Sequence, residues 1–518
     1  MGPVRREEEH VEVIDHTNNN NSTTNGVHPL KNGLKNCNGY IPWVQSQPPK
    51  ILPSILHHIG HTPMVRLNRI PKEEGIECEI FAKCELYAPG GSHKDRIALR
   101  MIEEAEADGR LVPGSTVIEP TSGNTGIGVA LVCAVKGYKC ILVMPEKMSA
   151  EKHETMAALG AKVVRTPKTV LHTTVAQQIQ KETPNSILLD QYGNNDNPRI
   201  HYETTAEEII EQCDGKLDMI VMGVGTGGII SGIGKKIKEK LPSCKVVGVD
   251  PEGSIMALPE SINQCNTNFW EVEGIGHDWL PNVLDRSVVD SWVKCNDKET
   301  FNMARRLIKD EGLLVGGSCG SALVGAIAAI KQAGLKRGQR VVIVLPDSVR
   351  NYMTKFLSDQ WMHERGFLPD VTEVTGKYSW WNKQVSSLPN SKVITPTLGR
   401  DATVGEAISI MRQGRYDQLP VVDSEGFMLG MATLNHLLNS LPSTEITSST
   451  KLDKFLFSQY KRVAETDSLG KLNYLLQGAH FAVVVEPVSR VNQDGKTVVL
   501  ERLKGILTSM DLAEVTLL

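Results

Sequence analysis

The region from about residue 50 to 365 alternates short apolar runs with stretches of helical periodicity. The runs are rich in valine, isoleucine, leucine and methionine, as strands buried on both faces of a sheet are; they span 116–119, 140–144, 162–165, 187–190, 219–222, 246–249 and 341–345. Between several of them, apolar residues recur at helical spacing, as in 127–136 and 150–159. This rhythm predicts an α/β fold with an open parallel sheet, whose ligand sites lie beyond the carboxyl ends of the strands.

A weak internal repeat follows in residues 393–518. The segment 401–437 has the pattern helix, strand, strand, helix, and 466–512 repeats that order. Two such units predict a second, α+β domain whose halves pack face to face. Between the two regions, residues 367–392 contain two prolines, many polar residues and the pair Trp380–Trp381, which predict a linker with an aromatic anchor.

The first 45 residues are polar and show no apolar period. Such a segment cannot bury enough apolar surface to offset the entropy of ordering it, which predicts disorder. A chain of 518 residues is long enough for two or three domains. We therefore expect a disordered segment 1–45, a core 46–366, a linker 367–392 and a tandem domain 393–518.

The composition excludes several classes of function. A net charge of -4 offers no electrostatic attraction to nucleic acid or to an anionic membrane. No run of about 18 apolar residues exists, and the start lacks the apolar core of a secretory signal, so we expect no membrane span and no secretion. The ten cysteines are scattered before residue 320 without a Cys-x-x-Cys pair. This pattern predicts reduced thiols in a cytoplasmic protein, with neither a disulfide framework nor a metal site.

Lys94 lies in the run 89–96 and opens a predicted helix, 94–109. A lysine reacts with an aldehyde only when its amine is uncharged, and an ordinary lysine at pH 7 is almost wholly ammonium. The positive end of the helix and partial burial would both lower its pKa, which is how a nucleophilic lysine arises. Taken alone, Lys94 is better interpreted as a solvated lysine at a helix start.

Further runs of small residues occur at 119–126, 221–228 and 316–321. The run 221–228 follows a predicted strand and precedes the lysine-rich helix 229–240, so its backbone N–H groups can bind a phosphate at a helix N-terminus. Glycines also serve close packing, and this loop alone is a weak signal. In combination with Lys94, the three runs predict a site for pyridoxal phosphate.

These runs, in this order, resemble the cystathionine β-synthase family, which are fold-type II pyridoxal-phosphate enzymes of the tryptophan synthase β superfamily. The resemblance extends from about Lys50 to the C-terminus and includes the long runs 118–128 and 346–359. It implies a fold-type II core with mostly parallel sheets, a C-terminal α+β tandem Bateman domain, and assembly into at least a homodimer.

The resemblance also implies a role for each matching residue. Lys94 would bond covalently to the cofactor aldehyde, Asn124 would hydrogen-bond its 3-hydroxyl, and Ser318 would face its ring nitrogen. The phosphate would be held by the loop residues Gly225, Thr226, Gly227, Gly228 and Ile229. The substrate α-carboxylate would bind to Thr121, Ser122, Thr125 and Gln191, and the homocysteine side would be lined by Gly276 and His277.

The implied reaction is a β-replacement in transsulfuration, a route of cysteine biosynthesis. L-Serine would lose its hydroxyl as water, L-homocysteine would add in its place, and L-cystathionine would be released. The freed amine of Lys94 would act as general base at the α-carbon. Because Ser318 is neutral, the ring would be a weaker electron sink, which favours prompt loss of the β-substituent. Cysteine in place of serine would release hydrogen sulfide.

The second repeat contains a candidate nucleotide site. Thr508 and Asp511 have a spacing in which an aspartate at a helix start can accept both hydroxyls of a ribose, whereas a histidine stands at the aligned position of the first repeat. We expect one site, formed by Thr508 and Asp511 with Asp417 and Gln418 of the other repeat, and the resemblance implies S-adenosylmethionine as its ligand. The alternative is a silent dimerisation module in which Asp511 is an ordinary helix cap.

The chain departs from the family pattern near the predicted site. His93 stands before Lys94 where valine is usual, Ile229 replaces a threonine, His277 a tyrosine and Gly193 an arginine. Loss of a side-chain bond to the phosphate would cost about 1.5–3 kcal/mol if nothing replaces it. An alternative function is therefore a divergent paralogue with a slow or silent site that binds adenosyl ligands. A cysteine synthase-like sulfhydrylase is another alternative.

Animal members of the family often carry haem in their N-terminal segment, held by a cysteine and a histidine. Here Cys37 is followed by Asn-Gly-Tyr, and the next histidines are His57 and His58 in a predicted helix, 53–59. A free cysteine and two unrelated histidines explain this pattern better, so we expect no haem.

Overall fold

The computed structural model describes residues 50–516 apart from 122, 147, 167–169, 266–268, 369–377, 389–395, 435–436, 438–446, 458–459 and 492–496. The predicted disordered segment, Cys37 and Ser122 lie outside the described residues. In the described part of the chain, no helix has the length and apolar character needed to span a bilayer. No cluster of histidine, cysteine and carboxylate side chains suited to a metal ion occurs in that part either. The nine described cysteines are free thiols, and eight of them are buried.

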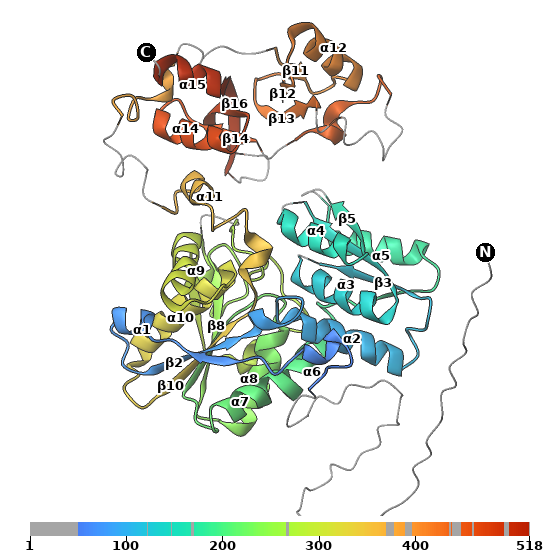
Figure 1. Ribbon diagram of the computed structural model, residues 1–518, viewed down its shortest axis with the longest axis vertical. Helices are drawn as coiled ribbons and strands as arrows, with labels where there is room; N and C mark the ends of the chain where they lie inside the picture. Colours follow the sequence, from blue (N-terminus) through green and yellow to red (C-terminus); the bar gives the residue numbers. More distant parts are fainter. Residues whose placement is uncertain are drawn as a thin grey trace, which may run out of the picture. The chain divides into compact units, whose positions relative to one another are not determined.

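The core contains a six-stranded sheet with the order β1-β2-β10-β7-β8-β9 (Figure 1). Of these six strands, β1 alone runs antiparallel to its neighbour. The strands are β1 (Met64–Arg66), β2 (Glu79–Cys84), β7 (Met219–Gly223), β8 (Lys245–Pro251), β9 (Ser291–Cys295) and β10 (Arg340–Leu345). The sequence predicted β7, β8 and β10. It missed β1, β2 and β9, which are partly exposed and lack a continuous apolar run.

A second, four-stranded sheet is parallel throughout and has the order β5-β4-β3-β6. Its strands are β3 (Thr116–Pro120), β4 (Lys139–Pro145), β5 (Lys162–Thr166) and β6 (Ser186–Leu188). All four were predicted, but as members of one open sheet with the others. The α/β class and the mostly parallel sheets are confirmed. Hydrophobic periodicity alone did not divide the strands between two sheets, because it marks strands without specifying their partners.

The helices of the core are α1 (Ile70–Glu73), α2 (Lys94–Ala107), α3 (Asn124–Lys136), α4 (Ala150–Ala158), α5 (His172–Glu182), α6 (Asp196–Ile200), a π-helical turn (His201–Thr205), α7 (Ala206–Gln212), α8 (Gly228–Lys240), α9 (Asp297–Glu311), α10 (Gly317–Ala333) and α11 (Asp359–Glu364). Helix α9 starts at a capping box of Asn296 and Glu299 and ends at left-handed Gly312. The predicted helix 53–59 is instead one 3-10 turn, Ile55–His58, because left-handed Gly60 ends it.

Helices cover both faces of the six-stranded sheet (Figure 1). Val221 and Ile343 pack into one hydrophobic cluster with α9 and α10, whereas Ile220 and Val342 pack into another with α7 and α8. This division follows from the strand geometry, since successive side chains point to opposite faces. Burial on both faces leaves the carboxyl ends of the strands as the place where loops can form a site.

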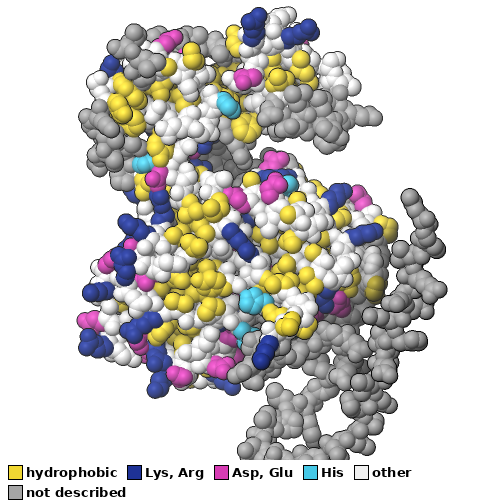
Figure 2. Space-filling view, in the orientation of Figure 1, with side chains coloured by type: hydrophobic (Ala, Val, Ile, Leu, Met, Phe, Trp, Pro, Cys, Tyr) yellow, Lys and Arg dark blue, Asp and Glu magenta, His cyan; other side chains and the backbone are white. Residues whose placement is uncertain are grey.

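The face of the molecule in Figure 2 carries charges of both signs. Figure 2 shows lysine and arginine side chains interspersed with acidic ones over the visible face, as the small net charge of -4 suggests.

The C-terminal region consists of two units of the predicted type. The first has a three-stranded sheet and one described helix, β11 (Leu398–Gly399), α12 (Val404–Gly414), β12 (Gln418–Val422) and β13 (Met428–Thr433). The second has β14 (Lys461–Val463), α14 (Leu469–Gln477), β15 (Phe481–Val491), β16 (Thr497–Thr508) and α15 (Ser509–Thr516). The repeat inferred from the sequence is therefore a structural repeat.

Residues 378–388, assigned to the linker from the sequence, pack inside the second unit. Trp381 is buried, and Val385 and Leu388 belong to the hydrophobic cluster that contains Leu469 of α14. The indole fits there because Gly470 has no side chain: a Cβ at that position would lie 2.3 Å from Trp381 Nε1. The aromatic anchor thus packs against the hydrophobic cluster that contains α14.

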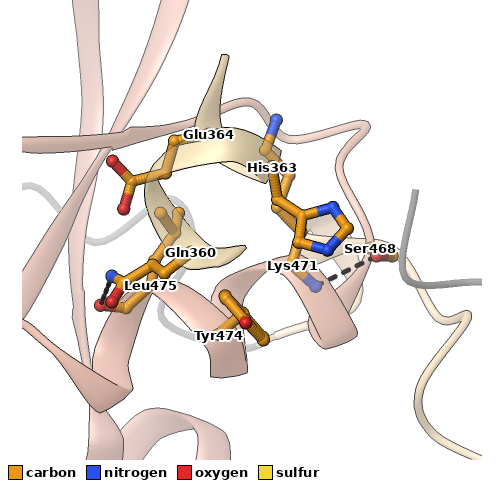
Figure 3. A pocket seen from close by; sticks show the side chains of 7 residues that line it. All are labelled: Gln360, His363, Glu364, Ser468, Lys471, Tyr474 and Leu475. Carbon is orange, nitrogen blue, oxygen red and sulfur yellow. Dashed lines mark hydrogen bonds between the residues drawn. The ribbon is translucent and has the colours of Figure 1, made fainter. Parts of the chain in front are cut away.

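Helix α11 of the core contacts α14 of the second unit. Gln360 Nε2 donates to Leu475 O at 3.2 Å, and the rings of His363 and Tyr474 lie 5.4 Å apart in an edge-on arrangement. Figure 3 shows the small pocket between these helices, which is lined by Gln360, His363, Glu364, Ser468, Lys471, Tyr474 and Leu475. These contacts join α11 to α14 through a hydrogen bond and an aromatic pair.

Candidate active site

The loop that follows β7 brings Thr226 to Lys94. Lys94 is the first residue of α2, and its Nζ donates to Thr226 Oγ1 at 3.1 Å. Burial lowers the pKa of Lys94 to about 8, against the opposing effect of the Glu119 carboxylate. The uncharged fraction of this amine at pH 7 is therefore about one tenth, far more than for an ordinary lysine, and the direction of the pKa shift agrees with the sequence prediction.

The loop at the start of α8 is shaped by its glycines. Gly227 has a φ of 90°, and the first intrahelical bond runs from Ser231 N to Gly227 O. The preceding amides therefore lie in the first turn, where helix geometry provides no acceptor for them. A Cβ on Gly225 would lie 2.2 Å from Gly274 O, and one on Gly228 would lie 1.9 Å from Asn197 Oδ1. Larger residues do not fit, so backbone donors line this loop as a phosphate requires.

The next residue, Ile229, is buried and belongs to the hydrophobic cluster against α7 and α8. It thus offers the phosphate loop its backbone N–H and not a side-chain donor. Asn197, which the sequence analysis did not single out, donates to Thr226 Oγ1 at 3.2 Å and to Gln191 O at 2.8 Å. It joins the loop to the segment that carries Gln191.

Asn124 starts α3 and is held on both ends of its amide. Its Nδ2 donates to Asp347 Oδ2 at 2.7 Å, and its Oδ1 accepts from Asn351 Nδ2 at 3.0 Å. Tyr352 also donates to Asp347 Oδ2. Sequence reasoning gave Asp347 and Asn351 no role, although Asp347 follows the carboxyl end of β10, where ligand sites are expected.

Ser318 is buried in the first turn of α10. Its Oγ lies 3.9 Å from the position that a Cβ on Gly274 would occupy, so it lies beside the same loop that touches Gly225. Three of the four runs singled out in the sequence therefore meet: Lys94 contacts the loop after β7, that loop contacts residue 274, and residue 274 lies near Ser318.

The predicted carboxylate-binding residues are only partly brought together. Thr125 Oγ1 donates to Gln191 Oε1 at 2.6 Å, and Gln191 Nε2 donates to Pro120 O at 3.1 Å. Thr121 is fully buried, and its hydroxyl oxygen accepts the N–H groups of Gly123 and Gly126, each at 2.9 Å. The Thr121 hydroxyl therefore stabilises the turn into α3.

His277 lies in an aromatic cluster. Its ring centroid is 5.6 Å from that of Tyr192 and 5.3 Å from that of Trp279. The backbone N–H of His277 donates to Ser254 Oγ at 3.0 Å. Gly276 before it has a φ of 81°, and a Cβ there would lie 2.5 Å from Pro251 Cγ. The sequence indicated His277 and Gly276 but not the two aromatic partners.

His93 is buried beside Lys94, and its Nδ1 lies 3.3 Å from Pro346 O. Burial and the neighbouring Lys94 hold the pKa of His93 well below its usual value, so the imidazole is neutral. The residue that replaces the usual valine therefore adds a polar ring without adding a charge next to the lysine.

A buried ion network was not anticipated from the sequence. Lys152 Nζ lies 2.6 Å from Glu273 Oε2, and Lys355 pairs with the other oxygen of Glu273. Burial opposes ionisation of Glu273, but Lys152 and Lys355 outweigh it and hold its pKa below the usual value. A Cβ on Gly123 would lie 2.2 Å from Lys152 Cδ. The network thus joins the turn before Asn124 to the loop that contains residue 274.

In the second repeat, Thr508 N and Oγ1 donate to Asp511 Oδ2 at 2.6 and 2.8 Å. This is the return bond of a helix cap, and it uses one carboxylate oxygen at the start of α15. Asp417 is exposed, and Gln418 begins β12 in the first unit.

Comparison with known families finds matches for both regions of the chain. The model of the pyridoxal-phosphate dependent enzymes matches residues 55–347, and the CBS domain model matches 385–443. Proteins named cystathionine beta-synthase are similar over most of the chain. That of Oryctolagus cuniculus is 52% identical over 90% of this chain and 85% of its own length. That of Saccharomyces cerevisiae is 39% identical over 89% of this chain and 97% of its own length.

Solved structures resemble the core. An O-acetylserine dependent cystathionine beta-synthase from Helicobacter pylori has a TM-score of 0.55 and 36% identity, and covers 59% of this chain and 98% of that one. A hydrogen sulfide-producing enzyme from Fusobacterium nucleatum has a TM-score of 0.55 and 38% identity, and covers 58% of this chain and 100% of that one.

Proposed function

Since this chain belongs to the cystathionine β-synthase family of pyridoxal-phosphate-dependent enzymes, we propose that it condenses L-serine with L-homocysteine to give L-cystathionine and water. The observation that carries this proposal is the placement of Lys94, an amine with a pKa of about 8, 3.1 Å from Thr226 in the phosphate-type loop. When bound, the cofactor supplies an electron sink for negative charge at the substrate α-carbon.

Each of the predicted site residues has a role in the proposed reaction. Lys94, once free of the cofactor, accepts the α-proton and later returns it. Gly225, Thr226, Gly227, Gly228 and Ile229 hold the phosphate, Asn124 binds the 3-hydroxyl, and Ser318 offers the ring nitrogen a neutral hydroxyl. Gln191 and Thr125, which contact each other at 2.6 Å, bind the substrate carboxylate with Ser122. Thr121 supports them through the turn into α3, and Gly276 and His277 line the thiol side.

Product analysis tests the proposal. The full chain loaded with cofactor and given serine and homocysteine should form cystathionine, detected by mass spectrometry. Lys94→Ala should lose activity by several orders of magnitude, whereas Lys336→Ala, at an exposed lysine far from the site chemistry, should retain it. Activity in Lys94→Ala equal to that of the unmodified chain would overturn the assignment.

The choice of the first substrate is tested in the same assay. Serine, cysteine and O-acetylserine are each offered with homocysteine, and water, sulfide or acetate is the respective leaving group. We propose serine as the preferred substrate, with cysteine giving hydrogen sulfide. O-acetylserine as the sole productive substrate would instead indicate a sulfhydrylase-like enzyme.

We also propose that the tandem domain binds S-adenosylmethionine through Thr508, Asp511, Asp417 and Gln418, that the chain forms at least a homodimer, and that it works in the cytoplasm. Eight buried free thiols support a reducing compartment. Calorimetric titration of S-adenosylmethionine into the full chain and into Asp511→Ala tests the ligand site. Equal affinities for the two proteins would count against it.

A further inference from the structure

The pairing of β3 with β6 ends in an unusual way. Backbone pairing joins Ile118 to Leu188, and Leu189 N donates to Ile118 O at 3.1 Å. The next two amides donate to a side chain instead. Asp190 N donates to Glu119 Oε2 at 2.9 Å, and Gln191 N donates to Glu119 Oε1 at 3.2 Å. The side chain of Glu119 thus replaces the backbone of β3 as the hydrogen-bond acceptor for these two amides.

Because these amides bond to a side chain and not to the backbone of β3, the chain can turn away from the sheet after Leu189. Asp190 adopts a φ of 56°, a left-handed conformation that a residue with a side chain occupies only when its surroundings hold it there. Gly193 N and Asn194 N both donate to Asp190 O, at 3.2 and 2.9 Å, which closes the turn. The turn directs the Gln191 side chain back to Pro120 O.

Glu119 itself is fully buried. A carboxylate in that setting is costly unless it is hydrogen-bonded, and the two amides provide those bonds. Burial raises the pKa of Glu119 to about 8, with the neighbouring Asp190 adding to the rise, while the two amides and Lys94 oppose it. An apolar residue would suit this strand position better if packing were its only purpose.

We infer that Glu119 is a positioning residue: it clamps the Asp190–Gln191 turn and thereby sets the place of Gln191 and Tyr192 at the substrate side of the site. The inference rests on the proposed function for the identity of the substrate, but the clamp itself is a property of the fold. Glu119 acts through Gln191 and does not itself bind the substrate.

The test uses Glu119→Gln in the full, cofactor-loaded chain. An amide can accept from one of the two N–H groups but presents a donor to the other, so one bond is lost. The matched control is Glu103→Gln, at another buried carboxylate whose oxygen lies 3.8 Å from Lys136 Nζ and which holds no such turn. Glu119→Asp keeps the carboxyl group but is one methylene shorter, and it serves as the test if the glutamine variant does not fold.

Hydrogen exchange of the amides in 189–194 should accelerate about tenfold in Glu119→Gln and remain unchanged in Glu103→Gln, since one of the two bonds from the turn amides to the residue 119 side chain is removed. The KM for serine should rise about tenfold, with a smaller change in kcat, because binding of the carboxylate is disturbed. Unchanged exchange in 189–194, faster exchange throughout the core, or an unchanged KM would each overturn the inference. Absence of cystathionine formation by the unmodified chain would overturn the proposed function and leave the exchange result standing.

Discussion

Arg96 offers a quantitative test of how the core supports the site. It lies two residues after Lys94 in α2 and is fully buried. Its guanidinium donates to both oxygens of Glu85, each at 2.8 Å, and to both oxygens of Glu208, at 2.6 and 2.8 Å. Lys83 Nζ donates to Glu208 Oε2 at 2.7 Å and completes the network.

Replacing Arg96 with methionine removes the four bonds from the guanidinium to Glu85 and Glu208 while keeping an unbranched apolar side chain in place of the arginine stem. Glu208 keeps Lys83, but Glu85 is left with the Thr62 hydroxyl, which donates to it at 2.6 Å. Breaking a buried ion pair by removing one partner costs about 3–5 kcal/mol, because the other charge stays buried without compensation. At about 2–4 °C per kcal/mol, the core should melt on the order of 10 °C lower.

Differential scanning calorimetry of the full chain measures this loss. The chain has more than one domain, so the core transition is identified as the one that moves upward when pyridoxal phosphate is added. The control is Arg306→Met, at a partly exposed arginine that pairs with Glu73 and Glu74. Solvent-exposed ion pairs contribute about 0–1 kcal/mol, so the control should shift the transition by at most a few degrees.

A second variant separates the buried charge from lost packing. Glu85→Gln in the Arg96→Met background removes the carboxylate left without its cation, so part of the lost melting temperature should return. The reasoning is refuted if Arg96→Met behaves like Arg306→Met, or if adding Glu85→Gln lowers the melting temperature further.

Two further predictions concern the cofactor loop and the lysine. Gly225→Ala should weaken cofactor binding about 5- to 150-fold, because the new Cβ would overlap Gly274 O at 2.2 Å and overpacking costs about 1–3 kcal/mol. The control in a fluorescence titration is Gly399→Ala, where a Cβ meets nothing within 4 Å, and equal cofactor affinities of the two variants would contradict the steric argument. Only the uncharged amine reacts, so acylation of Lys94 in the cofactor-free chain should become faster as the pH rises through about 8. Mass spectrometry of the peptide that contains Lys94 measures the rate. A midpoint near the ordinary lysine value would show that burial does not lower the pKa of Lys94.

Local features of the sequence determined much of this protein. The helix that starts at Lys94, the glycine loop before α8 and the helix-strand-strand-helix repeat were all readable from the sequence. Each depends on periodicity or on conformational limits of residues close together in the chain, and these properties are encoded locally. Strands such as β1 and β9 were not predicted, because they are partly exposed and therefore lack a continuous local run of apolar residues.

Tertiary structure alone decided which of these parts meet. Lys94 contacts Thr226, which is 132 residues away, and Asn124 is held by Asp347, which is 223 residues away. Packing also divides the strands between two sheets. It likewise places Glu119 where it accepts two hydrogen bonds from the turn after β6. No residue pattern specifies such pairings, because a buried polar group can form its hydrogen bond with any complementary donor or acceptor that the fold brings within about 3 Å.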